Sequence, residues 1–138
     1  YHDMNWGARP LEADFSSWVW SRAALGDHAH IVYDRVMRDG SESGFAVRIG
    51  PDGALTKIAM PKKIELGTAF WRMKRPAHAD HKIEGLTSLE DAPFYTRSLF
   101  HTAIDDEKVA VFHESLSLDR FRHPIIQKML PFKMPRRR

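Results

Sequence analysis

The chain has 138 residues, 43% of them hydrophobic and 28% charged, with a formal net charge of +3 and no cysteine. This length suits one globular domain with a core of its own, and the missing cysteines exclude a disulfide, a thiolate nucleophile, an iron–sulfur cluster and a Cys-based zinc site. No uncharged apolar run is long enough for a membrane span or a signal-peptide core, and a chain that begins at Tyr1 is expected to be a piece of a longer protein.

Short β-strands separated by polar turns are predicted for most of the chain. Alternating apolar residues and β-branched or aromatic runs favour strands, and Gly, Pro and Asp clusters such as residues 50–53 mark the turns between them. The predicted strands are 15–25, 29–38, 45–49, 55–60, 68–74, 81–86, 94–104 and 108–117. Such a series is typical of an antiparallel sandwich or barrel, so the fold class is all-β.

The pattern changes after the last predicted strand. Ser117 is placed to cap a helix over 118–129, and Pro124 either interrupts this helix or begins a second short one at 124–130. Residues 118–138 hold seven basic side chains and one acidic one, whereas the preceding 117 residues hold 14 basic and 17 acidic ones. A basic tail behind an amphipathic segment suits an anionic membrane surface at least as well as a phosphate backbone, so we expect no nucleic-acid partner.

The first seven residues concentrate groups that can take part in catalysis. In an extended conformation Tyr1, Asp3 and Asn5 share one face, and His2 and Trp6 lie on the other. A carboxyl group beside a tyrosine in a water-poor aromatic pocket keeps its proton near neutral pH, because its charged form loses hydration, and can then deliver that proton. The alternative is that Asp3 and Asn5 form turn hydrogen bonds while Trp6 closes one end of a barrel.

Other candidate residues lie on the predicted strands. Trp18 and Trp20 share a strand face, where they either line an apolar ligand cavity or fill the core. His28 and His30 are spaced to face one metal ion, but no third ligand is visible in the pattern, so we expect no metal site. The sequence also lacks a phosphate-binding glycine loop and a nucleophile elbow, which argues against nucleotide-dependent chemistry.

Arg97 and His101 share a face of the strand at 94–104. An arginine that points into a barrel needs a charged partner, and Glu114 on the next strand is the candidate. A structural ion pair is the expected role.

Two groups of residues resemble the carotenoid 1,2-hydratase family, also called hydroxyneurosporene synthases. At the N-terminal end these are Tyr-His-Asp-Met-Asn-Trp-Gly at 1–7, Pro-Leu-Glu at 10–12, Asp-Phe at 14–15, Trp-Val-Trp-Ser-Arg at 18–22 and Tyr-Asp at 33–34. At the C-terminal end they are residues 89–98, the run His-Glu-Ser-Leu-Ser-Leu-Asp-Arg-Phe at 113–121, and residues 129–136. The resemblance spans essentially the whole chain, whereas residues 40–75 are generic.

The resemblance implies a fold and an activity. Family members consist of two lipocalin-like β domains, so the chain is expected to be the C-terminal one: an active-site link at 1–14, an antiparallel lipocalin-like barrel at 15–117, and a short helix with a basic tail at 118–138. A missing N-terminal domain is then a partner. These enzymes add water across the terminal C1–C2 double bond of acyclic carotenoids such as neurosporene and lycopene, without a cofactor.

The same resemblance assigns roles to residues. The family's catalytic Tyr-x-Asp pair falls on Tyr1 and Asp3, while its His-x-Trp pair lies upstream of this sequence. The residues expected to contact the apolar substrate are His2, Asn5, Trp6, Trp18 and Trp20. The protein is expected in the cytoplasm, peripheral on the inner membrane, held by the C-terminal helix and residues 136–138. The alternative function is a non-catalytic lipocalin-like binder of an apolar isoprenoid or similar ligand.

Overall fold

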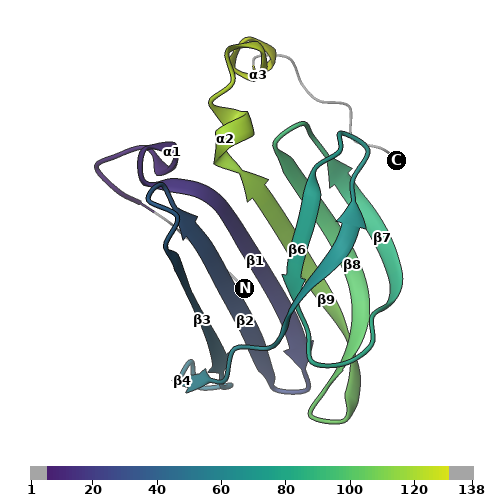
Figure 1. Ribbon diagram of the computed structural model, residues 1–138. Helices are drawn as coiled ribbons and strands as arrows, with labels where there is room; N and C mark the ends of the chain where they lie inside the picture. The colour runs from purple at the N-terminus through teal and green to yellow at the C-terminus, as the bar shows by residue number, and fades with distance from the viewer. Residues whose placement is uncertain (1–5, 131–138) are drawn as a thin grey trace.

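A computed structural model describes residues 6–130 as a large curved sheet with a two-stranded sheet laid across one face (Figure 1). The strands are β1 Phe15–Leu25, β2 His28–Met37, β3 Glu42–Ile49, β4 Leu55–Ile58, β5 Lys63–Thr68, β6 Lys74–His78, β7 Glu84–Asp91, β8 Tyr95–Ile104 and β9 Glu107–Ser117. The helices are α1 Leu11–Asp14, α2 Leu118–Phe121 and α3 Pro124–Met129. The all-β prediction is thereby confirmed.

The large sheet has seven antiparallel strands in the order β4-β3-β2-β1-β9-β8-β7. In the described part of the chain no pairing joins β4 to β7, so the sheet is open and a closed lipocalin-like barrel is not confirmed. The reason is local: β4 has only four residues, and the hairpin β5–β6 packs against β1 and β9 instead of extending an edge.

The covered face of the sheet holds the core. Alternate residues of β8 and β9 are buried, as expected for strands with one packed face. The apolar cluster consists of Ala23, Leu25, Leu66, Ala77, Phe100, Val109 and Val111. It lies toward the end of the sheet that carries the β1–β2 and β8–β9 turns, and the covered face beyond it is polar.

Most predicted strand positions are confirmed, and one is wrong. Residues 68–74 were expected to form a strand because of their aromatic run, but residues 69–73 make the turn of the β5–β6 hairpin. Arg72 has a φ of 55°, which a strand cannot contain. The guanidinium of Arg120 on α2 donates to the carbonyls of Trp71 and Arg72 at 2.7 and 2.9 Å and so fixes this turn.

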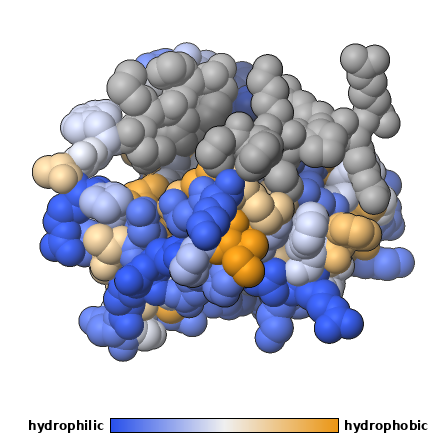
Figure 2. Space-filling view, turned by 90° about the horizontal axis from the view of Figure 1, so that it is seen from above, coloured by the Kyte–Doolittle hydropathy of each residue, from blue (hydrophilic) through white to orange (hydrophobic). Residues whose placement is uncertain are grey.

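The C-terminal end follows the second of the two helix predictions. The Ser117 side chain accepts a hydrogen bond from the Arg120 amide and caps α2, and Pro124 occupies the first turn of α3. Viewed from the end that carries the helices, hydrophobic side chains form small patches among hydrophilic ones (Figure 2). No helix within residues 6–130 is long and apolar enough to cross a membrane.

Candidate functional site

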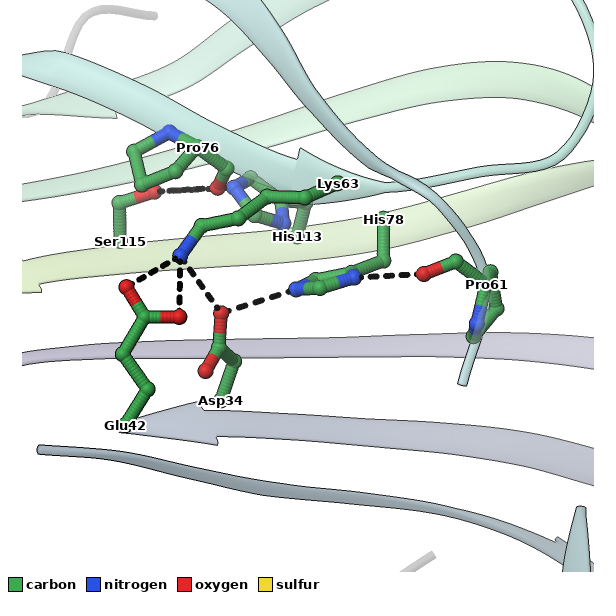
Figure 3. Close-up of polar contacts among 8 residues, drawn as sticks. All are labelled: Asp34, Glu42, Pro61, Lys63, Pro76, His78, His113 and Ser115. Atoms are coloured by element: carbon green, nitrogen blue, oxygen red, sulfur yellow. Dashed lines mark hydrogen bonds and ion pairs between the residues drawn. The ribbon is translucent and has the colours of Figure 1, made fainter. Parts of the chain in front are cut away.

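A buried polar cluster lies between the β5–β6 hairpin and the large sheet (Figure 3). Its centre is a pair formed by Asp34 of β2 and His78 of β6, whose Oδ2 and Nε2 atoms are 2.9 Å apart. Both residues are buried. Gly44 of β3 lies opposite Asp34, and a Cβ there would stand 2.7 Å from the Tyr33 carbonyl oxygen, so the strands approach closely at the site.

The hydrogen bonds of His78 determine what the pair can do. Its Nδ1 lies 2.8 Å from the Pro61 carbonyl oxygen, which only accepts, so Nδ1 carries a hydrogen. The contact between Nε2 and Asp34 then holds one proton, either on the imidazole or on the carboxyl group. Both ring nitrogens of His78 are therefore engaged in hydrogen bonds inside the fold.

Lys63 of β5 connects this pair to the surface. Its ammonium group lies 3.4 Å from Asp34 and 3.2 Å from Glu42 of β3 (Figure 3). Partial burial by itself lowers the pKa of Lys63, but the hydrogen bond to Glu42 and the two negative charges outweigh it, and the pKa is raised. Lys63 therefore stays charged and compensates the carboxylates.

A second buried imidazole lies on β9. His113 is fully buried, and its Nε2 lies 2.9 Å from the hydroxyl of Ser115, which donates in turn to the Pro76 carbonyl. Burial, followed by the positive charges of Arg75 and His78, lowers the pKa of His113 to about 4. His113 is thus neutral at pH 7, with its hydrogen on Nε2.

Arg75 of β6 supplies a buried positive charge beside these imidazoles. Its guanidinium donates to the carbonyls of Gly67 and Leu66 at 3.3 and 3.2 Å and lies 3.5 Å from the Ser98 hydroxyl. These acceptors are neutral, so among the residues that the structure describes the guanidinium charge is balanced by dipoles. The covered face of the sheet is consequently polar at this end.

A cavity of about 360 Å³ adjoins the cluster. His78 lines both, and the apolar wall includes Val32, Ile58 and Val111. His30 and Asp105 line the same cavity. A small molecule or several waters fit this volume.

The residues predicted from sequence lie elsewhere or outside the structure. Tyr1, His2, Asp3 and Asn5 are outside the described residues, so the structure tests none of their roles. Trp6 is described and is 87% exposed. The structure therefore neither assembles nor excludes the predicted N-terminal site.

Trp18 and Trp20 share one face of β1, as predicted, but it is the face that the hairpin leaves uncovered. Their neighbours Val19 and Ser21 point to the covered side and are buried, whereas the two tryptophans are half-buried. Trp18 lies 5.7 Å from the ring of Tyr33. Neither tryptophan lines the cavity or belongs to the apolar core cluster.

The predicted ion pair between Arg97 and Glu114 is confirmed, but it lies on the uncovered face of the sheet and not in an interior. Its Nε donates to Glu114 at 3.0 Å and to the Tyr95 hydroxyl at 2.9 Å. Burial and the Glu114 carboxylate raise the pKa of Tyr95. Thr96 and Ser98 are the buried neighbours, so Arg97 lies on the uncovered face and does not point into an interior.

Sequence reasoning missed the Asp34–His78 pair, because 44 residues separate its members. Asp34 and His113 both fall within the runs that carry the family resemblance, which was the available signal. It also missed that Asp105 lies 4.0 Å from His30 and supplies a third candidate metal ligand beside His28.

Comparison with known proteins gives the family. The family model described as "Carotenoid hydratase CrtC" matches residues 1–138. The chain belongs to the CrtC carotenoid hydratase family. It is 42% identical over 139 aligned residues to an acyclic carotenoid 1,2-hydratase of Thiocapsa roseopersicina, and 39% identical over 140 to one of Rhodobacter capsulatus.

These CrtC relatives are longer than the chain. The alignments cover 99% of this chain but 34% and 50% of the two relatives, so the chain spans at most about half of their length. A crystal structure of a Nitrosomonas europaea protein provisionally named AttH has a TM-score of 0.52 and 15% identity. It matches 81% of this chain and 42% of that one and supports the fold alone.

Proposed function

We propose that the protein containing this chain adds water across the terminal C1–C2 double bond of an acyclic carotenoid of the neurosporene or lycopene type. The observation that carries this proposal is the match of the whole chain to the CrtC family model, supported by relatives at 36–42% identity that are named acyclic carotenoid 1,2-hydratases. The reaction places the protein in carotenoid biosynthesis as a hydro-lyase.

The proposed reaction needs one acid, one water molecule and no cofactor. A proton added to C2 of the trisubstituted alkene leaves a tertiary cation at C1. Water attacks C1 and loses a proton, so the net change is the addition of one water molecule. Asp3 is the proposed proton donor and recovers its proton from the attacking water, while Tyr1 orients either group through its hydroxyl.

The proposed substrate contacts follow the aromatic residues. Trp6, Trp18 and Trp20 offer π faces to the cation, an interaction of about 2 kcal/mol when desolvated, and His2 and Asn5 complete the site. Because Trp18 and Trp20 lie on the uncovered face of β1, substrate that contacts them lies against that face and not in the cavity. A missing N-terminal domain that covers this face would exclude bulk water from the cation.

We further propose that the protein works at the cytoplasmic side of the inner membrane, from which an apolar polyene must be taken. The end that carries the helices exposes apolar side chains: Phe70 is 70% exposed, Trp71 41%, Ile125 62% and Leu130 42%. In the sequence, residues 131–138 follow with four basic side chains. Apolar groups beside clustered positive charge are what an anionic bilayer surface binds.

The test of the proposed reaction uses the full-length protein with lycopene or neurosporene in vesicles. Wild-type protein is expected to form the 1-hydroxy product, and Asp3→Asn is expected to abolish it while leaving the circular dichroism spectrum unchanged. Asp52→Asn, an exposed turn residue, is the matched control and retains activity. Ligand-dependent quenching of tryptophan fluorescence without any product would instead indicate the alternative, a non-catalytic binder.

A further inference from the structure

The β1–β2 and β8–β9 turns lie at the same end of the sheet (Figure 1), and three potential metal ligands meet there. His28 and His30 lie two residues apart on β2, so their rings share a face, with centroids 5.4 Å apart. The β8–β9 turn brings Asp105 to the same place, with Oδ2 4.0 Å from Nε2 of His30. One ligand atom from each residue lies within 4.8 Å of the other two.

One ring nitrogen of each histidine lacks a hydrogen-bond partner among the described residues. Nε2 of His28 and Nε2 of His30 are both buried, and neither has a hydrogen-bond partner. Nδ1 of His28 lies 3.2 Å from the Asp27 carboxylate, which only accepts, and 3.4 Å from the Arg48 guanidinium, which only donates. We assign the hydrogen of His28 to Nδ1 from the shorter of these two contacts, which leaves the Nε2 lone pair free. A histidine held by a carboxylate on one nitrogen and open on the other is the usual arrangement of a metal ligand.

We propose that His28, His30 and Asp105 form a binding site for a zinc ion. Two neutral imidazoles and one carboxylate are a common three-ligand zinc set, with a fourth position left for water. Zinc–ligand distances of about 2.0–2.2 Å require the three groups to close by roughly 1 Å. Asp105 can move that far, because its side chain is 68% exposed on a turn, whereas the histidines are 15% and 13% exposed and held by β2.

The site has a structural consequence. In the sheet, β2 and β8 are separated by β1 and β9, so a zinc ion here would tie two non-neighbouring parts of the curved sheet together. His30 and Asp105 also line the 360 Å³ cavity, so the fourth zinc position faces it. The nearby positive charge is Arg48, whose Nη2 lies 3.4 Å from Nδ1 of His28, on the nitrogen that does not bind the ion. This inference is independent of the proposed hydration.

The experiment measures zinc binding to metal-free full-length protein by competition with a fluorescent zinc chelator, using zinc ions alone as the probe. His30→Gln and Asp105→Asn are each compared with wild type, and His123→Asn is the control. His123 caps α3, and asparagine keeps that cap. We expect His30→Gln and Asp105→Asn to lose one zinc equivalent, or to bind it at least 10- to 100-fold more weakly, since even the loss of a group that only orients a ligand costs that much.

Two further measurements test which residues bind the ion and whether zinc ties β2 to the β8–β9 turn. Cobalt(II) bound at the same site is expected to give the visible absorption bands of a four-coordinate ion in wild type and in His123→Asn but not in Asp105→Asn. Zinc is expected to raise the melting temperature of wild type and of His123→Asn but not that of Asp105→Asn. Equal zinc affinity in wild type and Asp105→Asn, or no zinc bound by wild type beyond the amount that His30→Gln binds, would overturn the proposal. Circular dichroism verifies that each variant is folded.

Discussion

Acidification is expected to destabilise the fold through one buried group, His113. Its pKa is lowered to about 4 by burial and by the charges of Arg75 and His78, whereas an unfolded histidine titrates near pH 6.5. Between these two values the unfolded chain binds one proton more than the folded chain. The free energy of unfolding therefore has its full value above about pH 6.5 and decreases as the pH drops toward 4. A difference of about 2.5 pKa units corresponds to roughly 3 kcal/mol.

The assay is urea unfolding at pH 7.0 and pH 4.5, followed by circular dichroism, for wild type, His113→Gln and His123→Asn. The glutamine side chain can still donate a hydrogen bond to Ser115 but does not titrate. Between pH 7.0 and pH 4.5 we expect wild type and the exposed-histidine control to lose roughly 2 kcal/mol more stability than His113→Gln does, since the full difference is reached only below pH 4. The same pH dependence in His113→Gln and wild type would refute the reasoning.

Three further predictions concern the cluster, the hairpin turn and the tail. Asp34→Ala is expected to lower the free energy of unfolding by about 3–5 kcal/mol, because the buried His78 loses its hydrogen-bond partner. Asp34→Asn is expected to cost less, and equal losses of the two variants in urea unfolding would contradict this. Arg120→Ala removes the hydrogen-bond donor of three backbone carbonyls and is expected to lower the free energy of unfolding by about 2–3 kcal/mol. Amide hydrogen exchange at residues 69–73 is expected to become faster, and unchanged exchange there would show that Arg120 does not fix this turn. Deleting residues 133–138 is expected to weaken the free energy of binding to anionic vesicles by about 1 kcal/mol for each basic residue removed, measured by co-sedimentation. Unchanged binding would rule out the tail as a membrane anchor.

Local sequence signals predicted the elements whose structure depends on near neighbours. The alternation that begins at Phe15 predicted β1 at its observed bounds. Ser117 marked the start of α2, and the alternative in which Pro124 begins a second short helix is the one observed. The turn at 69–73 was missed because an aromatic run favours a strand, and the contact that overrides this preference comes from Arg120, some 48 residues away. The closed barrel was not confirmed, because whether two edges pair depends on the position of the hairpin, which no local pattern encodes.

The difference between local sequence signals and tertiary contacts also explains which site residues could be predicted. The period of two placed Trp18 and Trp20 on one face, but only the position of the β5–β6 hairpin decides which face is covered. His28 and His30 were visible as a pair, whereas Asp105 joins them through the curvature of the whole sheet. The Asp34–His78 pair likewise depends on tertiary packing. Residue types and spacing identified the family, and the geometry of the covered face came from the structure.

The proposed hydration is tested most directly by product analysis in water enriched in oxygen-18. Full-length wild-type protein incubated with lycopene is expected to yield a 1-hydroxy product that carries one oxygen-18 atom, detected by chromatography and mass spectrometry. Folded Asp3→Asn protein is expected to yield none. Unchanged lycopene with wild-type protein would contradict the proposed reaction, and full conversion by Asp3→Asn would contradict the role of Asp3.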